Sequence, residues 1–153
     1  MLKYLNTEVT CGEVPDEITL CINITNCKNA CPGCHSPYLA NDIGEELNEE
    51  SLSKLIDDNF GISCVCFMGG DIDPKRVQEL AKFVKKEYKG EIKTAWYSGR
   101  NEPPSPFNAR LFDFVKIGAY MADFGALTSR MTNQHFYRVE NGKLIDETYK
   151  FWK

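Results

Sequence analysis

The sequence predicts an α/β fold, an open partial (β/α) barrel with a mainly parallel sheet. Segments with strand patterns alternate with segments of helical periodicity, which is the arrangement of βαβ units and parallel strands. The chain has 153 residues, which suits a single domain spanning residues 1–153. This length falls short of the roughly 250 residues that a complete eight-unit barrel needs, so we expect the barrel to be incomplete.

The first half of the chain alternates between the two patterns. Residues 2–10 are predicted to form a short edge strand, and apolar residues alternate with polar or small ones through Glu17–Thr25, as in a strand. Apolar residues then recur at near-helical spacing from Leu47 to Ile56, with Asn48 as the expected N-cap. The continuous apolar run Ser63–Gly70 is typical of a buried parallel strand.

The second half continues the alternation. Asp73-Pro74 predicts the start of an amphipathic helix, because Asp is a good N-cap and Pro suits the first helical position. Two further strands are expected at Ile92–Tyr97 and Phe114–Ile117, and His135–Phe151 is expected to form a hairpin that turns at Asn141-Gly142. The loops that follow the parallel strands should therefore meet at one edge of the sheet.

Composition and charge exclude several classes of protein. The 18 basic and 22 acidic residues give a net charge of −4, which argues against sequence-independent binding to nucleic acid. No apolar run approaches the ~20 residues that span a bilayer, and the first residues lack the apolar region of a secretory signal. The 7 cysteines are odd in number, which favours reduced thiols in the cytoplasm. Cys21, Cys64 and Cys66 are predicted to be buried in the core.

Three other cysteines are clustered directly after the first alternating strand. Cys27, Cys31 and Cys34 have the spacing C-x3-C-x2-C. Clustered cysteine thiolates are the usual ligands of iron–sulfur clusters, and three ligands leave one coordination position open. The alternative is a structural zinc site in which His35 or a distant cysteine is the fourth ligand.

The spacing resembles that of the radical S-adenosylmethionine enzymes. The version Cys31-Pro32-Gly33-Cys34 looks like the activating proteins of anaerobic ribonucleoside-triphosphate reductases, and the likeness extends from about Leu20 to Arg138. Met68-Gly69-Gly70-Asp71 resembles the glycine–glycine–glutamate segment of the wider family, with aspartate in place of glutamate. Thr132-Asn133-Gln134 resembles a segment near the C-terminus of the activators. The fold implied is a truncated barrel of the radical S-adenosylmethionine type.

The resemblance implies that Cys27, Cys31 and Cys34 bind three irons of a [4Fe–4S] cluster and are the catalytic residues. The fourth iron would bind the amino and carboxylate groups of S-adenosylmethionine. One electron, supplied by a donor such as a flavodoxin, would cleave the sulfonium bond and yield methionine and a 5′-deoxyadenosyl radical. The difficult chemistry would belong to the cofactor, while the protein holds it and keeps water away.

The expected cofactor-binding residues lie in loops that follow strands. Gly33 has no side chain and allows a ligand to approach the backbone, while His35 either contacts the adenine or cluster rim or is a polar loop residue. Gly69 and Gly70 would offer backbone carbonyls to the ammonium group of S-adenosylmethionine, with Asp71 as a nearby negative charge. The full expected set is Gly33, Cys34, His35, Gly69, Gly70, Asp71 and Ser98.

Three further segments leave alternatives open. Ser98-Gly99 and Lys116 are placed to contact the ribose or carboxylate of the ligand, or else are a turn and a solvated lysine. Thr132-Asn133-Gln134 is carried over from the resemblance as an active-site or partner-facing loop.

The resemblance implies a cytoplasmic enzyme that generates a glycyl radical on an anaerobic ribonucleotide reductase catalytic subunit. One alternative keeps the chemistry but changes the partner to another glycyl radical enzyme, such as a formate-lyase type. The short chain and the lack of a second cysteine cluster count against it. A second alternative is a non-catalytic zinc or iron–sulfur binding module.

Overall fold

The computed structural model describes residues 2–25, 43–104, 106–119, 121 and 123–152. The cysteine-rich segment falls in one of the gaps between these ranges. Five of the predicted site residues therefore lie outside the described residues, and they are Cys27, Cys31, Gly33, Cys34 and His35.

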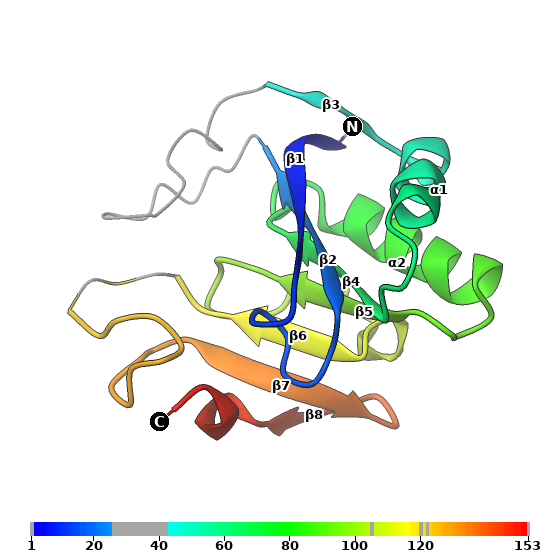
Figure 1. The fold of residues 1–153 in the computed structure, drawn as a ribbon. Helices are drawn as coiled ribbons and strands as arrows, with labels where there is room; N and C mark the ends of the chain where they lie inside the picture. The colour runs from blue at the N-terminus through cyan, green and yellow to red at the C-terminus, as the bar shows by residue number, and fades with distance from the viewer. Residues whose placement is uncertain (1, 26–42, 105, 120, 122, 153) are drawn as a thin grey trace.

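The described residues form an α/β protein with one open sheet of eight strands, in the order β3-β1-β2-β4-β5-β6-β7-β8 (Figure 1). The strands are β1 (Leu2–Thr10), β2 (Thr19–Ile24), β3 (Glu45–Leu47), β4 (Cys64–Met68), β5 (Lys93–Tyr97), β6 (Phe114–Ile117), β7 (His135–Glu140) and β8 (Lys143–Asp146). Within this part of the chain the sheet ends at β3 and β8 and does not close into a barrel.

The sheet is mixed, which corrects the prediction of a mainly parallel one. Its centre, β2-β4-β5-β6, is parallel, but β1, β3, β7 and β8 are added to its two sides by antiparallel pairing. Residues 2–10 were expected at an edge, whereas β1 lies between β2 and β3. The edge on that side is β3, whose Leu47 was predicted to belong to the following helical pattern. Local periodicity identifies strands but does not reveal which neighbours they pair with.

Two helices connect the parallel strands and lie on the same face of the sheet (Figure 1). Helix α1 (Glu49–Asp58) begins with a capping box between Asn48 and Ser51. Helix α2 (Pro74–Glu87) is capped by the Asp73 side chain, with Pro74 at its first position. Both predicted starts are confirmed. The short helices η2 (Ala109–Leu111) and η3 (Thr148–Phe151) were not predicted. No helix of the described ranges is long and apolar enough to cross a membrane.

Side chains alternate between the two faces of the sheet, so each face has its own core. On the helix side, residues such as Ile22, Phe67 and Trp96 pack with α1 and α2. On the other side, Cys21, Cys64 and Cys66 are buried, as predicted. This second core also contains Val14, Ala95, Tyr97, Phe114, Leu127 and Phe136. The helix-free side of the sheet is therefore covered by loops.

The C-terminal hairpin is confirmed, with β7 and β8 joined at Asn141 and Gly142. Both turn residues have positive φ, 52° and 79°, as a two-residue turn of the I′ type requires. Helix η3 then folds back toward β7, where the Thr148 hydroxyl accepts a hydrogen bond from the Phe136 N–H at 2.9 Å.

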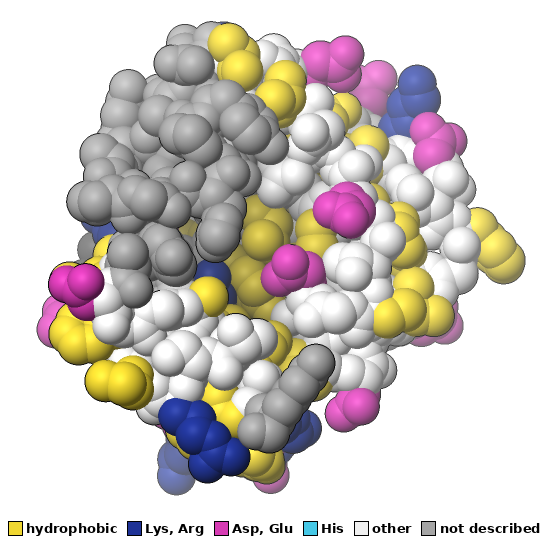
Figure 2. All heavy atoms as spheres, turned by 60° about the vertical axis from the view of Figure 1, so that its left-hand side comes forward, with side chains coloured by type: hydrophobic (Ala, Val, Ile, Leu, Met, Phe, Trp, Pro, Cys, Tyr) yellow, Lys and Arg dark blue, Asp and Glu magenta, His cyan; other side chains and the backbone are white. Residues whose placement is uncertain are grey.

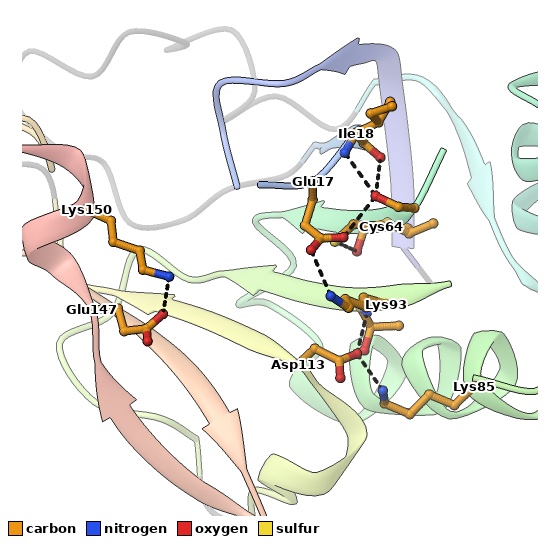
Figure 3. Close-up of polar contacts among 11 residues, drawn as sticks. Glu17, Ile18, Cys64, Lys85, Lys93, Asp113, Glu147 and Lys150 are labelled. Carbon is orange, nitrogen blue, oxygen red and sulfur yellow. Dashed lines mark hydrogen bonds and ion pairs between the residues drawn. The ribbon is translucent and has the colours of Figure 1, made fainter. Parts of the chain in front are cut away.

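Polar side chains tie the amino ends of the parallel strands together (Figure 3). Lys93 at the start of β5 forms an ion pair of 2.8 Å with Glu17, just before β2. Glu17 also accepts a hydrogen bond of 2.9 Å from the Ser63 hydroxyl, just before β4. Asp113, just before β6, pairs with Lys85 of α2 at 2.7 Å. These structural contacts cover the amino end of the parallel strands, and the described members of the predicted site lie at the opposite end.

Candidate functional site

The carboxyl ends of β2, β4, β5 and β6 lie together because these strands are parallel neighbours. The chain leaves β2 at this edge through Thr25 and continues into the cysteine-rich segment. Gly69-Gly70-Asp71 follows β4, Ser98 follows β5 and Gly118 follows β6. The structure therefore brings the described members of the predicted site to one edge of the sheet, as expected for a ligand site in an open α/β sheet.

Gly69 and Gly70 form a close-packed turn between β4 and α2. Both have positive φ, 105° and 88°. A Cβ at Gly70 would lie 2.5 Å from Cγ2 of Val77, so glycine lets α2 approach the end of β4. The Gly69 carbonyl accepts a hydrogen bond of 2.7 Å from the Trp96 indole N–H, and the Gly70 carbonyl accepts one of 3.0 Å from the Asp73 N–H. Each carbonyl oxygen therefore uses one of its two lone pairs within the fold.

Asp71 is a buried carboxylate held in a fixed orientation, with 7% of its surface exposed. The Ser98 hydroxyl donates to its Oδ1 at 2.5 Å, and the Gly99 N–H donates to its Oδ2 at 2.9 Å. The Arg100 N–H in turn donates to the Ser98 hydroxyl at 3.1 Å. A buried charge needs such partners. The sequence analysis predicted Asp71 and Ser98 as separate ligand contacts. It did not predict that the Ser98 hydroxyl orients the Asp71 carboxylate.

Asn133 and Gln134 brace the loop that follows β6. The Gln134 side-chain amide donates to the Gly118 carbonyl at 3.2 Å, and that of Asn133 donates to the Ala119 carbonyl at 2.9 Å. The Gly118 N–H donates to the Arg100 carbonyl at 2.6 Å, which joins this loop to the one after β5. Gln134 is 4% exposed, so it serves the interior of the loop rather than facing outward.

A cavity of about 560 Å³ lies on the face opposite the helices. Figure 2 shows a hollow beside the grey atoms, with hydrophobic side chains at its floor and charged groups next to it. Lys116, on β6, lines the cavity with its ammonium 5.0 Å from the centre of the Tyr97 ring. The other lining residues are Glu8, Gly12, Glu13, Cys21, Asn23, Met68, Ala126, Leu127, Thr128, Gln134 and Phe151.

The sequence analysis named Lys116 as a ligand contact or a solvated lysine, and it did not name the acidic residues that line the same cavity. Glu8 and Glu13 belong to β1 and the turn after it. No local pattern distinguishes them from other exposed acidic residues, because their role depends on how that turn folds over the sheet.

Two of the buried cysteines near this cavity are protonated thiols at neutral pH, because burial raises the pKa of Cys64 and that of Cys66 well above the ordinary value. The described residues contain no group of three or more His, Cys, Asp or Glu side chains that would hold a metal ion. The predicted metal ligands are the cysteines that lie outside the described ranges.

No family model matches this chain, and no curated protein or solved structure matches it either.

Proposed function

We propose that this protein is a radical S-adenosylmethionine activating enzyme that generates a glycyl radical on an anaerobic ribonucleoside-triphosphate reductase. Cys27, Cys31 and Cys34 would hold a [4Fe–4S] cluster. The observation that carries the proposal is the C-x3-C-x2-C motif, because it follows β2 directly and β2 lies beside the strand that ends at Gly69-Gly70-Asp71. The enzyme would act in the cytoplasm and receive its electron from a donor such as a flavodoxin.

The arrangement of the sheet supports this proposal. Four adjacent parallel strands with both α-helices of the described residues on one face are compatible with an incomplete (β/α) barrel of the radical S-adenosylmethionine type. In such a barrel the ligand binds at the carboxyl ends of the strands. Here that edge has the glycine turn, a buried carboxylate and the start of the cysteine-rich segment.

The hydrogen-bond acceptors at this edge fit the amino group of S-adenosylmethionine. The ligand carries an ammonium group, and Asp71 is a carboxylate whose orientation is set by Ser98 and Gly99 before any ligand arrives. The remaining lone pairs of the Gly69 and Gly70 carbonyls are further acceptors for an ammonium. A preformed negative site of this kind binds a cation without having to reorganise first.

When bound, the cluster would supply the electron that cleaves the sulfonium bond. The protein's own task is to bind, orient and exclude water. Asp71 would fix the ligand at the end of β4. The cavity beside the strand ends would receive the glycine segment of the partner. Hydrogen transfer from that glycine needs close contact with the ligand, so positioning is expected to dominate the rate.

Anaerobic reconstitution followed by a two-part assay tests this function. The expected protein is brown, holds about four irons and four sulfides per chain, and releases 5′-deoxyadenosine and methionine when reduced with S-adenosylmethionine. Addition of the reductase should give the doublet of a glycyl radical in electron paramagnetic resonance.

Each failure of that assay has its own meaning. A colourless protein with one tightly bound zinc would overturn the proposal, and a cluster that does not respond to S-adenosylmethionine would leave only a non-catalytic iron–sulfur module. Normal cleavage without a doublet on the reductase would reject this partner and favour another glycyl radical enzyme.

A further inference from the structure

The cavity opposite the helices has charges of opposite sign on its two sides. Glu8 and Glu13 come from β1 and the turn after it, whereas Lys116 comes from β6. Between them lie apolar or weakly polar groups, including Met68 and Leu127. At about 560 Å³ the cavity falls within the ~300–1,000 Å³ range of ligand-binding pockets.

Lys116 is held in place by its neighbours in the sheet. It pairs with Tyr97 of β5 on one side and Phe136 of β7 on the other. Its ammonium lies 5.0 Å from the centre of the Tyr97 ring, and the Tyr97 hydroxyl is itself anchored by a hydrogen bond to the Glu13 carbonyl. Apolar walls of this kind strengthen the attraction between Lys116 and an anion, because the local dielectric is low.

Uncharged polar groups also line the cavity. Asn23 contributes an amide and Thr128 contributes a hydroxyl, whereas the amide nitrogen of Gln134 is already bonded to the Gly118 carbonyl. A peptide backbone that enters a cavity must have its N–H and C=O groups hydrogen-bonded, and amides and hydroxyls can serve both. A ligand with several phosphate charges fits less well, because Glu8 and Glu13 would repel it.

We propose that this cavity binds a peptide segment of the partner protein and that Lys116 selects a segment with a carboxylate side chain beside the target residue. Glu8 and Glu13 would favour a basic side chain on the other side of that residue. The identity of the partner rests on the proposed function, but the choice of charges rests on the cavity alone. Lys116 is thus a specificity-determining residue.

Synthetic peptides test the choice of charges without any cofactor chemistry. The probes are fluorescein-labelled heptapeptides centred on glycine, with Glu and Lys flanking it in either order, with two Lys, or with two Ser. Their affinities for the full chain, purified anaerobically, are measured by fluorescence anisotropy. A peptide with Glu and Lys should bind most tightly. Lys116→Met should lower the affinity for the Glu–Lys peptide about tenfold to a hundredfold, because a charge-assisted contact is lost. The affinity for the two-Ser peptide should not change.

Matched variants make the result specific. Lys143→Met makes the same chemical change at an exposed position of β8 and should leave all affinities unchanged. Lys116→Glu should shift the preference to the peptide with two Lys. If Lys116→Met does not fold by circular dichroism, Glu13→Gln provides a second arm, in which the discrimination between the Glu–Lys and two-Ser peptides should narrow.

Three outcomes would overturn the inference. The first is equal affinity for all peptides, and the second is an equal effect of Lys116→Met and Lys143→Met on those affinities. The third is displacement of the peptide by free glutamate at the same concentration, which would indicate a small-molecule site. Charge-selective binding by a protein that assembles no cluster would reject the proposed function while keeping this inference. A normal glycyl radical yield without charge-selective peptide binding would support the proposed function and reject this inference.

Discussion

The hydroxyl of Ser98 donates a hydrogen bond of 2.5 Å to the carboxylate of Asp71 and so joins the ends of β5 and β4. The backbone N–H of Gly99 occupies the other carboxylate oxygen. Both oxygens of Asp71 are therefore oriented by the loop after β5. In the proposed function, the ammonium group of S-adenosylmethionine would meet this oriented carboxylate, and Ser98 would act on the ligand through Asp71.

Asp71→Asn should weaken S-adenosylmethionine binding while leaving the iron and sulfide content unchanged. The substitution removes the charge that attracts the ammonium group, and a charge-assisted hydrogen bond contributes about 1.5–3 kcal/mol. Titration calorimetry on the reconstituted protein measures the change. Asp73→Asn is the matched control, because Asn caps a helix about as well as Asp, so α2 and the binding should both be retained. Unchanged binding in Asp71→Asn would leave Asp71 as a turn residue only.

Gly70→Ala should destabilise the fold more than Gly90→Ala does. Both glycines have positive φ, 88° and 76°, so both variants share the backbone cost of a left-handed conformation. Only at Gly70 does the added Cβ also meet Val77, at 2.5 Å, whereas at Gly90 it meets nothing within 4 Å. Overpacking of this kind costs about 1–3 kcal/mol. Urea unfolding of the two variants measures the difference, and equal losses would show that α2 does not need the close approach.

The parts of the fold that the sequence predicted are those with a local signal. The Asn48 cap, the Asp73 cap and the Asn141-Gly142 turn each depend on residues within a few positions of one another. The three residues of β3 contain two glutamates and have no such signal. Their strand conformation comes from antiparallel pairing with Leu2–Tyr4, a tertiary contact that periodicity does not report.

The same division applies to the candidate site. Gly69, Gly70 and Asp71 stand out because they follow an apolar run. The contact between Asp71 and Ser98 depends on the register of β4 against β5, which cannot be read from either segment alone. That Lys116, Glu8 and Glu13 line one cavity depends on how the turn after β1 folds over the sheet, so only the structure reveals it.

Glu147 should make the stability of the C-terminal hairpin depend on pH. Its side chain is 10% exposed and lies 3.0 Å from Arg138. It also forms an ion pair of 3.1 Å with Lys150, which Figure 3 shows. Burial by itself raises the pKa of Glu147, but the interactions with Arg138 and Lys150 outweigh it and lower the pKa below the ordinary value. The folded state therefore favours the ionised form. This stabilisation is complete above the unfolded pKa of about 4.3 and is lost as the pH falls through the folded pKa.

Urea unfolding at a series of pH values checks this behaviour. The free energy of unfolding should fall from about pH 5 downward, and Glu147→Gln should reduce that fall. Glu140→Gln is the control, because Glu140 contacts the same Arg138 at 2.7 Å but is 54% exposed, and exposed pairs contribute only about 0–1 kcal/mol. Identical pH profiles for the wild type and Glu147→Gln would contradict the prediction.

Cys31→Ala should abolish both S-adenosylmethionine cleavage and formation of the glycyl radical, because a cluster needs the third thiolate of the motif. Iron and sulfide content after anaerobic reconstitution should fall with the activity. Cys11→Ala is the control, since Cys11 is an exposed free cysteine outside the motif and its loss should change neither quantity. Cys64→Ala removes a buried thiol instead, so it should lower the free energy of unfolding while the iron content per folded chain stays the same. If Cys31→Ala retained full iron content and cleavage, the motif would not be the cluster site, and the cysteines of the core would have to be reconsidered as ligands.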